Sequence, residues 1–205
     1  MDRGSGVTSG LLVTLEGLDG VGKTTQIERL KSWLQDKVEV LAVREPGGTA
    51  LGEALRNVIL HRVEAGSALA EFLVFAAARA ELMHQIVLPA LTRGAVVLMD
   101  RFIDSSVAYQ AFGRDLSVEA VMTVNRIATQ GRTPDLTVWL RGQPYETGSP
   151  DRLEQRDLAY FARVEAGYEW LVRQDPERWL VVDCRQPADV VFDTLVRAVA
   201  RRMTS

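Results

Sequence analysis

The chain has 205 residues, with 24 Lys and Arg against 27 Asp and Glu and a formal net charge of -3. This balance argues against a nucleic-acid binder, which normally carries a basic surplus, but it allows a local basic pocket for phosphates. No run approaches the ~20 apolar residues that a membrane span needs. The single cysteine, Cys184, excludes an internal disulfide and a cysteine-based zinc site. We therefore expect a cytoplasmic protein that acts on neither a membrane nor a nucleic-acid polymer.

Residues 1–10 are predicted to form a flexible lead, because they are small, polar and lack the apolar stretch of a signal peptide. Residues 11–205 contain no repeat or linker and are predicted to form one domain. Short apolar runs bounded by charge, Gly or Pro are typical of strands in a parallel sheet covered on both faces. The predicted strands are Leu11 to Leu15, Val38 to Val43, Ala95 to Met99, Leu136 to Leu140 and Trp179 to Val182.

Helical patterns lie between these runs. A long pattern covers about Ser67 to Leu91, and apolar residues from Ala188 to Val199 recur at the spacing of one helical face. Strands alternating with helices predict a three-layer α/β fold, with a five-stranded parallel sheet flanked by helices. Ligands of such sheets bind beyond the carboxyl ends of the strands.

The first predicted strand runs into a glycine-rich loop. The sequence from Gly17 to Thr24 matches G-x-x-x-x-G-K-[ST], the P-loop, whose backbone N–H groups cradle phosphates. Lys23 would reach the β and γ phosphates of ATP, and Thr24 would place a hydroxyl on Mg²⁺. The alternative is an ordinary glycine turn, but the preceding strand and the following helical pattern favour the P-loop. The predicted ATP-binding residues are Gly17, Leu18, Asp19, Gly20, Val21, Gly22, Lys23, Thr24, Thr25 and Arg152.

A P-loop alone leaves GTPases, motors and small-molecule kinases open. Three further segments decide between them: Arg44 to Thr49 (REPGGT), Phe75 to Arg79 (FAAAR) and Asp100 to Gln110 (DRFIDSSVAYQ). In this order and spacing they resemble the thymidylate kinase family, over nearly the full chain. The resemblance implies a P-loop NTPase fold, ATP and thymidine monophosphate (dTMP) as substrates, Mg²⁺, and a homodimer formed through the apolar faces of the long helices.

The resemblance also assigns residues to the acceptor nucleotide. Arginine offers a rigid fork of donors for a phosphate dianion, and Arg44 and Arg101 follow strand ends. In the family the aromatic ring at Phe75 stacks on thymine, and Arg79, four residues later on the same helical face, bonds its carbonyl edge. The full predicted dTMP set is Asp19, Arg44, Arg56, Phe75, Arg79, Arg101, Ser105, Ser106, Tyr109 and Gln110.

Lys23, Arg101 and Asp100 are the predicted catalytic residues, with Thr24 and Asp100 at Mg²⁺. Plainer structural roles exist for several of these positions. Phe75 could be an ordinary core aromatic, and Arg44, Arg56 and Arg79 could be solvated surface charges. Asp100 could cap a helix.

The lid is where the sequence departs from the family. The family carries a mobile, arginine-bearing segment after the fourth strand, here a short lid-like segment near 141–156. An Asp151-Arg152-Leu153-Glu154 element fits, but the expected arginines before it are missing. Arg152, with Arg141 or Arg156, is then left to serve ATP, or the lid is deficient.

Other functions remain open from the sequence. The nearest alternative is another nucleoside monophosphate kinase or a deoxynucleoside kinase. A nucleotide-binding switch is disfavoured because no Asn-Lys-x-Asp guanine motif occurs. A catalytically silent homologue is a further alternative, because of the unusual lid.

Overall fold

The computed structural model describes residues 10–62, 67–142 and 158–204 of the chain. Its strands are β1 (Leu11–Glu16), β2 (Val40–Arg44), β3 (Val96–Asp100), β4 (Leu136–Arg141) and β5 (Trp179–Asp183). Each begins and ends within two residues of its predicted run. The strand pattern was therefore a sound guide to the sheet.

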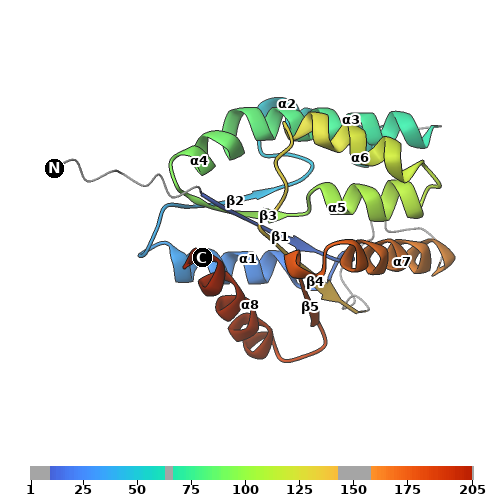
Figure 1. Cartoon of the computed structure of the whole chain (residues 1–205). Helices are drawn as coiled ribbons and strands as arrows, with labels where there is room; N and C mark the ends of the chain where they lie inside the picture. The colour runs from blue at the N-terminus through green and yellow to red at the C-terminus, as the bar shows by residue number, and fades with distance from the viewer. Residues whose placement is uncertain (1–9, 63–66, 143–157, 205) are drawn as a thin grey trace.

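Helices connect these strands (Figure 1). They are α1 (Lys23–Leu34), α2 (Ala50–Asn57), η1 (Val58–Arg62), α3 (Ala68–Leu82), η2 (Met83–Val87), α4 (Leu88–Thr92), α5 (Ile103–Ser106), η3 (Val107–Phe112), α6 (Val118–Ala128), α7 (Leu158–Gln174), η4 (Pro176–Arg178) and α8 (Ala188–Met203).

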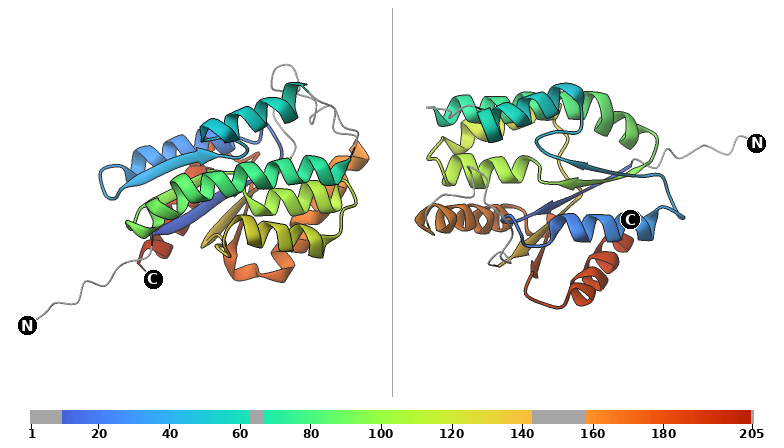
Figure 2. Two further views of the ribbon diagram at one scale, coloured as in Figure 1. Left: turned by 90° about the horizontal axis from the view of Figure 1, so that it is seen from above. Right: turned by 180° about the vertical axis from the view of Figure 1, so that it is seen from behind.

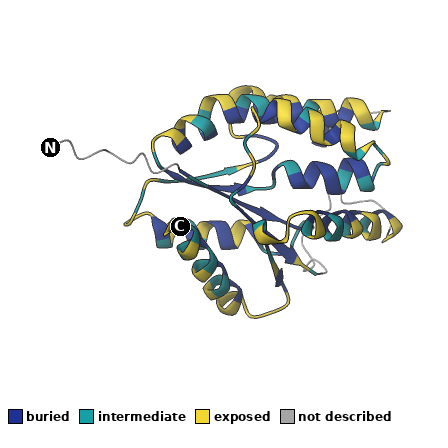
Figure 3. Cartoon of the chain, viewed as in Figure 1, coloured by how far each residue is buried: buried dark blue, intermediate teal, exposed yellow. Residues whose placement is uncertain are grey.

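The strands form one parallel sheet in the order β2-β3-β1-β4-β5. Helices lie on both of its faces, as the views from above and behind show (Figure 2). The strands between them are mostly buried (Figure 3). This three-layer α/β arrangement confirms the predicted fold class.

The central strand β1 shows why the sheet needs two covering layers. Side chains alternate across a strand, so Val13 and Leu15 face one side and Leu12 the other. Val13 and Leu15 pack with α1 and α8, whereas Leu12 packs with the end of α3, η2 and α4. Glu16, two residues beyond Thr14 in the same alternation, is also fully buried. The strand thus delivers a carboxyl group to the interior just before the P-loop.

The predicted helix over 67–91 is a helical run of α3, η2 and α4 that contains a π-helical segment. By length and composition alone Ala68–Thr92 could cross a membrane. Phe72, Leu82 and Met83 are nevertheless buried against neighbouring elements of the described structure, as in the core helix of a globular fold. This helix also carries Phe75 and Arg79 toward the carboxyl edge of the sheet.

Residues 1–9 of the predicted lead and most of the lid-like segment lie outside the described residues. Gly10 pairs its amide with the Leu91 carbonyl oxygen at 2.9 Å. The division of the chain into a lead, one domain and a lid therefore stays a prediction.

Candidate active site

The P-loop joins β1 to α1, as its pattern predicts. Gly17, Gly20 and Gly22 have φ angles of 133°, 74° and 95°, which side chains disfavour. At Gly17 a Cβ would also lie 2.5 Å from the Leu140 carbonyl oxygen. Glycine is therefore required there by both backbone conformation and space. The loop delivers the N-terminus of α1 to the edge where phosphates bind in such folds.

Lys23 is buried at the start of α1, and its ammonium donates to the carbonyl oxygens of Gly17 and Leu18 at 3.2 and 2.7 Å. Burial, with a smaller contribution from the charge of Arg101, lowers the pKa of Lys23 to about 8. Asp100 and Asp19 oppose this shift. An anionic phosphate near Lys23 would favour its charged form.

Thr24 and Asp100 meet at the mouth of the P-loop. The Thr24 hydroxyl donates to Asp100 Oδ2 at 2.8 Å, and Thr24 is exposed. Both supply the hard oxygen atoms that Mg²⁺ prefers. The two predicted metal ligands are therefore adjacent, and their oxygen atoms would fit such an ion. Thr25 is exposed on the next position of α1.

Arg101 follows β3 in an unusual backbone conformation, with φ of 69°. A non-glycine residue in this left-handed region is strained, and such strain gathers at functional sites. Its guanidinium donates to Asp19 Oδ1 at 2.7 Å, to the Tyr109 hydroxyl at 3.2 Å and to Ser105 Oγ at 3.1 Å. The guanidinium thus reaches from β3 to the P-loop.

The Asp19–Arg101 pair shapes the local electrostatics. Burial raises the pKa of Asp19, but the charges of Arg101 and Lys23 outweigh burial and hold that pKa below its usual value. Burial opposes the charge of Arg101 as well, yet Tyr109 and Asp19 raise its pKa well above the ordinary value. Both groups are therefore charged at neutral pH. A cation is fixed where two phosphorylated ligands would meet.

Arg79 is buried, which excludes the alternative of a solvated surface arginine. All five of its N–H groups are used within the protein. Nε and Nη2 donate to Glu45 Oε2 at 2.8 and 2.6 Å, and Nη1 donates to Ser106 Oγ at 3.0 Å. The remaining donors bond Asn125 Oδ1 and the Phe102 carbonyl oxygen. A direct bond from Arg79 to a base would have to share or replace one of these contacts.

Arg79, Glu45 and Ser106 line a cavity of about 100 Å³, which we call the acceptor cavity after the predicted acceptor residues in its lining. Phe75, from the same helix as Arg79, is half-buried and lines the cavity, so the purely core alternative does not hold. The cavity also brings together other predicted acceptor residues, namely Asp19, Arg56, Arg79, Arg101, Ser105, Ser106, Tyr109 and Gln110.

Arg44 is the predicted acceptor residue that does not line this cavity. Its side chain is 57% exposed and pairs with Glu53 at 3.3 Å. The Glu53 carboxylate also accepts from the Gly48 amide at 2.9 Å, which ties the Arg44 to Thr49 segment to α2. Arg56 lies closer to the site, and its Nη1 donates to the Pro46 carbonyl oxygen at 2.9 Å.

Sequence reasoning missed several residues of this region. Glu45, Pro46, Leu60 and Phe161 line the cavity beside the predicted set. Glu45 pairs with Arg79, although burial outweighs that contact and raises the pKa of the Glu45 carboxyl. Glu45 lies inside the REPGGT segment, and this position could have predicted that it lies near the site. For Leu60 and Phe161, an apolar residue in a helix gave no functional signal.

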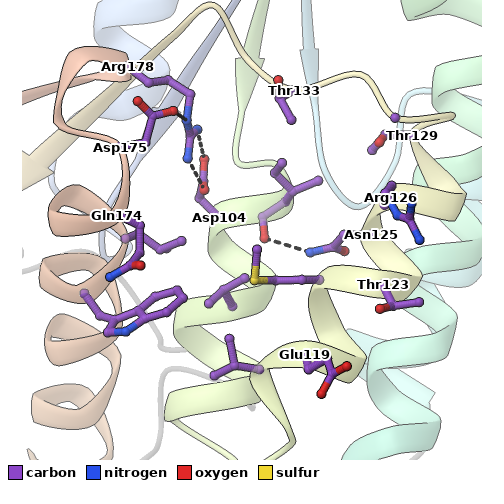
Figure 4. Close-up of a pocket in the computed structure, with 17 residues that line it drawn as sticks. Asp104, Glu119, Thr123, Asn125, Arg126, Thr129, Thr133, Gln174, Asp175 and Arg178 are labelled. Carbon is purple, nitrogen blue, oxygen red and sulfur yellow. Dashed lines mark hydrogen bonds and ion pairs between the residues drawn. The ribbon is translucent and has the colours of Figure 1, made fainter.

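A second and larger cavity of about 820 Å³ is lined by residues of α5, η3, α6, α7 and η4 (Figure 4). On one wall Asp104 forms an ion pair with Arg178 at 2.7 Å. On another, Asn125 donates to the Ile103 carbonyl oxygen at 3.1 Å, while its Oδ1 accepts from Arg79 at 2.6 Å. Asn125 therefore links this wall to Arg79 in the lining of the smaller cavity.

The donor side is less complete. Arg141, at the end of β4, donates to Glu165 at 2.9 Å and Glu169 at 2.7 Å, and these two carboxylates are partly exposed on α7. Arg152 and Arg156 lie outside the described residues. Which arginine serves ATP is therefore still a prediction.

Comparison with known proteins identifies the family. The family model described as thymidylate kinase matches residues 15–195. The chain belongs to the thymidylate kinase family. It is 42% identical to a thymidylate kinase of Deinococcus radiodurans, over 96% of this chain and 99% of that protein. It is 41% identical to one of Caldanaerobacter subterraneus, over 93% and 95%.

A solved structure agrees with this assignment. The crystal structure of thymidylate kinase from Ehrlichia chaffeensis superposes with a TM-score of 0.80 at 28% sequence identity. The match covers 93% of this chain and 99% of that chain. Thymidylate kinases are enzymes of phosphoryl transfer, and the resemblance drawn from the sequence motifs is confirmed at the level of family and fold.

Proposed function

We propose that the chain transfers the γ-phosphoryl group of ATP to dTMP, giving dTDP for dTTP synthesis. The observation that carries this proposal is the contact between the P-loop and the acceptor cavity. Asp19 belongs to the loop, Arg101 lines the cavity, and the two side chains meet at 2.7 Å. A phosphate on each side of this contact would lie close enough for direct transfer.

Transfer requires an oxygen of the dTMP phosphate to attack the γ-phosphorus while the bond to the β–γ bridging oxygen breaks and ADP leaves. The protein supplies position and charge rather than covalent chemistry. Lys23 and the loop amides stabilise negative charge on the donor side, and Arg101 stabilises it at the junction. Mg²⁺, when bound beside Thr24 and Asp100, offsets further charge on the ATP phosphates.

We assign recognition of the base to the part of the acceptor cavity that Phe75, Ser106 and Gln110 line. Phe75 offers a ring for stacking, and Ser106 and Gln110 offer polar atoms to a pyrimidine edge. Arg79 holds Ser106 through the 3.0 Å bond to its Oγ. Tyr109 would crowd the 2′ position and disfavour a ribonucleotide. Asp19 would meet the 3′-hydroxyl.

Arg152 is proposed to serve ATP from the lid. Closure over ATP excludes water, which otherwise competes for the phosphoryl group. ATP hydrolysis without an acceptor measures this directly. A hydrolysis rate comparable to the rate of transfer to dTMP would mean that closure fails.

A homodimer is proposed from exposed apolar side chains on neighbouring helices. They lie on α2 and η1, on α3 and on α6, which adjoin one another in Figure 1; they are Leu51, Val58, Leu69, Leu73, Met122 and Ile127. An apolar surface of this kind is typical of a protein interface. We propose a cytoplasmic location for the dimer. Light scattering after size exclusion tests the dimer, and a monomeric mass at micromolar concentration would refute it.

A coupled assay with ATP and Mg²⁺ across the common nucleoside monophosphates tests the function. The proposal predicts that dTMP gives the highest kcat/KM. A higher value for another monophosphate would indicate a different nucleoside monophosphate kinase. ADP formation with a nucleoside but no monophosphate would indicate a deoxynucleoside kinase. No turnover with any acceptor would indicate a catalytically silent homologue.

A further inference from the structure

Glu16 is the last residue of β1 and has no exposed surface, and it does not line the acceptor cavity. A carboxyl group without solvent must be hydrogen-bonded to be tolerated. Its Oε1 accepts from the Phe102 amide at 2.8 Å. Its Oε2 accepts from the Ser105 hydroxyl at 2.5 Å and the Tyr168 hydroxyl at 3.0 Å. Both oxygens therefore act as acceptors, toward donors from two other parts of the chain.

Two of the Glu16 partners, Phe102 and Ser105, are connected to Arg101: Phe102 follows it in the chain, and Ser105 bonds its side chain. The Arg101 amide donates to the Leu15 carbonyl oxygen at 3.0 Å, and the next amide, of Phe102, donates to Glu16. Consecutive residues of β1 thus hold the backbone on both sides of the strained Arg101. The Ser105 hydroxyl that donates to Glu16 also accepts from Arg101 Nη1 at 3.1 Å.

We propose that Glu16 is a positioning residue for phosphoryl transfer, holding the backbone that follows Arg101 through the Phe102 amide and the Arg101 guanidinium through Ser105. The inference rests on the proposed function only in naming the reaction; the contacts exist without it. A displacement of about 1 Å at a transferring group can cost about 100-fold in rate, so the position of Arg101 matters as much as its charge.

The charge state of Glu16 gives this role a measurable signature. Burial, assisted by the nearby charge of Asp104 and opposed by Ser105, Arg101 and Tyr168, raises the pKa of Glu16 to about 7. Lys23 and Arg178 also interact with it electrostatically.

The ionised form accepts all three bonds. The protonated form must donate one itself, and a proton on Oε2 would compete for Ser105. Because the carboxylate predominates only above pH 7, the hold on Arg101 weakens as pH falls through 7.

The test compares the wild type with Glu16→Gln from pH 5.5 to 9, at saturating ATP, Mg²⁺ and dTMP. At pH 8 we expect kcat of the variant to fall about 10- to 100-fold, with KM for dTMP changed less than about threefold. We also expect the ratio of wild-type to variant kcat to shrink as the pH falls below 7, because only the wild type loses the Glu16 carboxylate. Titration of the substrate phosphates is common to both proteins and cancels in this comparison.

Thr14→Val is the matched control, because Thr14 is buried on the same face of β1 and bonds Thr137 rather than Arg101. Its kcat and pH profile should match the wild type within about twofold. Thermal unfolding of each variant at pH 8 reports its folding. A folded Glu16→Gln variant whose kcat stays within about twofold of the wild type at every pH would overturn the inference.

A second readout does not depend on turnover. The Arg101 side chain is 16% exposed, so phenylglyoxal should modify it slowly in the wild type. Peptide mass mapping should find modification at least about fivefold faster in Glu16→Gln, on the scale of a released side chain. Equal rates would refute the positioning role. If the wild type turns over no monophosphate, the proposed function fails, and this measurement still decides the role of Glu16.

Discussion

The acceptor and donor halves of the site differ in how much of each is built from contacts within the protein. In the acceptor half, Arg79 and Arg101 are held by buried or half-buried partners from several elements. In the donor half, Thr24 is exposed, and Arg141 pairs with carboxylates on the surface. The difference teaches that the acceptor pocket is set by the fold itself, whereas Thr24 and Arg141 on the proposed donor side make contacts at the surface that a bound ligand could replace.

Arg101→Ala should have the largest effect. The variant loses the cation that joins the two halves, and kcat should fall by at least ~100-fold, the scale of losing one key electrostatic contact. Steady-state kinetics at saturating substrates measure it. A variant within threefold of the wild type would show that Arg101 does not act in transfer.

Arg79→Ala tests whether the acceptor half depends on its buried pair. The Arg79 and Glu45 side chains are only 3% and 4% exposed, and removing one partner leaves the other charge buried. We expect the free energy of unfolding to fall by about 3 kcal/mol, together with a higher KM for dTMP. Urea denaturation measures the first effect. A loss below about 1 kcal/mol would mean that Glu45 takes up a proton or another partner at little cost.

Phe75→Ala tests the stacking face of the acceptor cavity. Stacking of a base on an aromatic ring is worth about 1–3 kcal/mol, so KM for dTMP should rise about tenfold or more. Val190→Ala is the control, because Val190 is an exposed apolar residue of α8 outside the cavity and the proposed dimer surface. Equal KM values for the two variants would remove the stacking role.

Arg44→Ala should have the smallest effect. Arg44 and Glu53 form an exposed pair, and such pairs contribute little, so the free energy of unfolding should change by less than about 0.5 kcal/mol. The KM for dTMP should rise only about threefold, because Arg44 does not line the cavity. A loss in kcat as large as that of Arg101→Ala would show that Arg44 moves into the site when substrate binds.

The sequence was most informative where a residue type is required by local geometry. The strands, the P-loop glycines and the spacing of Phe75 and Arg79 follow from period and turn chemistry, and the fold confirms the resulting architecture. The roles of Glu16 and Asn125 could not be predicted in this way. Each is an ordinary polar residue in an apolar element, and its partners lie 86 and 46 positions away along the chain.

The predicted helix over 67–91 shows a similar limit. Its apolar pattern gave the extent of the helical run. The residue types of η2 did not predict that this segment would be π-helical. Arg44 and Arg101 looked equivalent as arginines after strand ends. Only the tertiary structure distinguishes the exposed side chain from the one held against the P-loop.

The claim that the acceptor half is set by the fold is tested most directly by calorimetric titration of dTMP in the absence of ATP. We predict that dTMP binds with a Kd within about threefold of the value measured with a non-hydrolysable ATP analogue and Mg²⁺. A coupling factor of tenfold corresponds to about 1.4 kcal/mol between the sites. Binding that is absent without the analogue, or more than tenfold tighter with it, would contradict a preformed acceptor pocket.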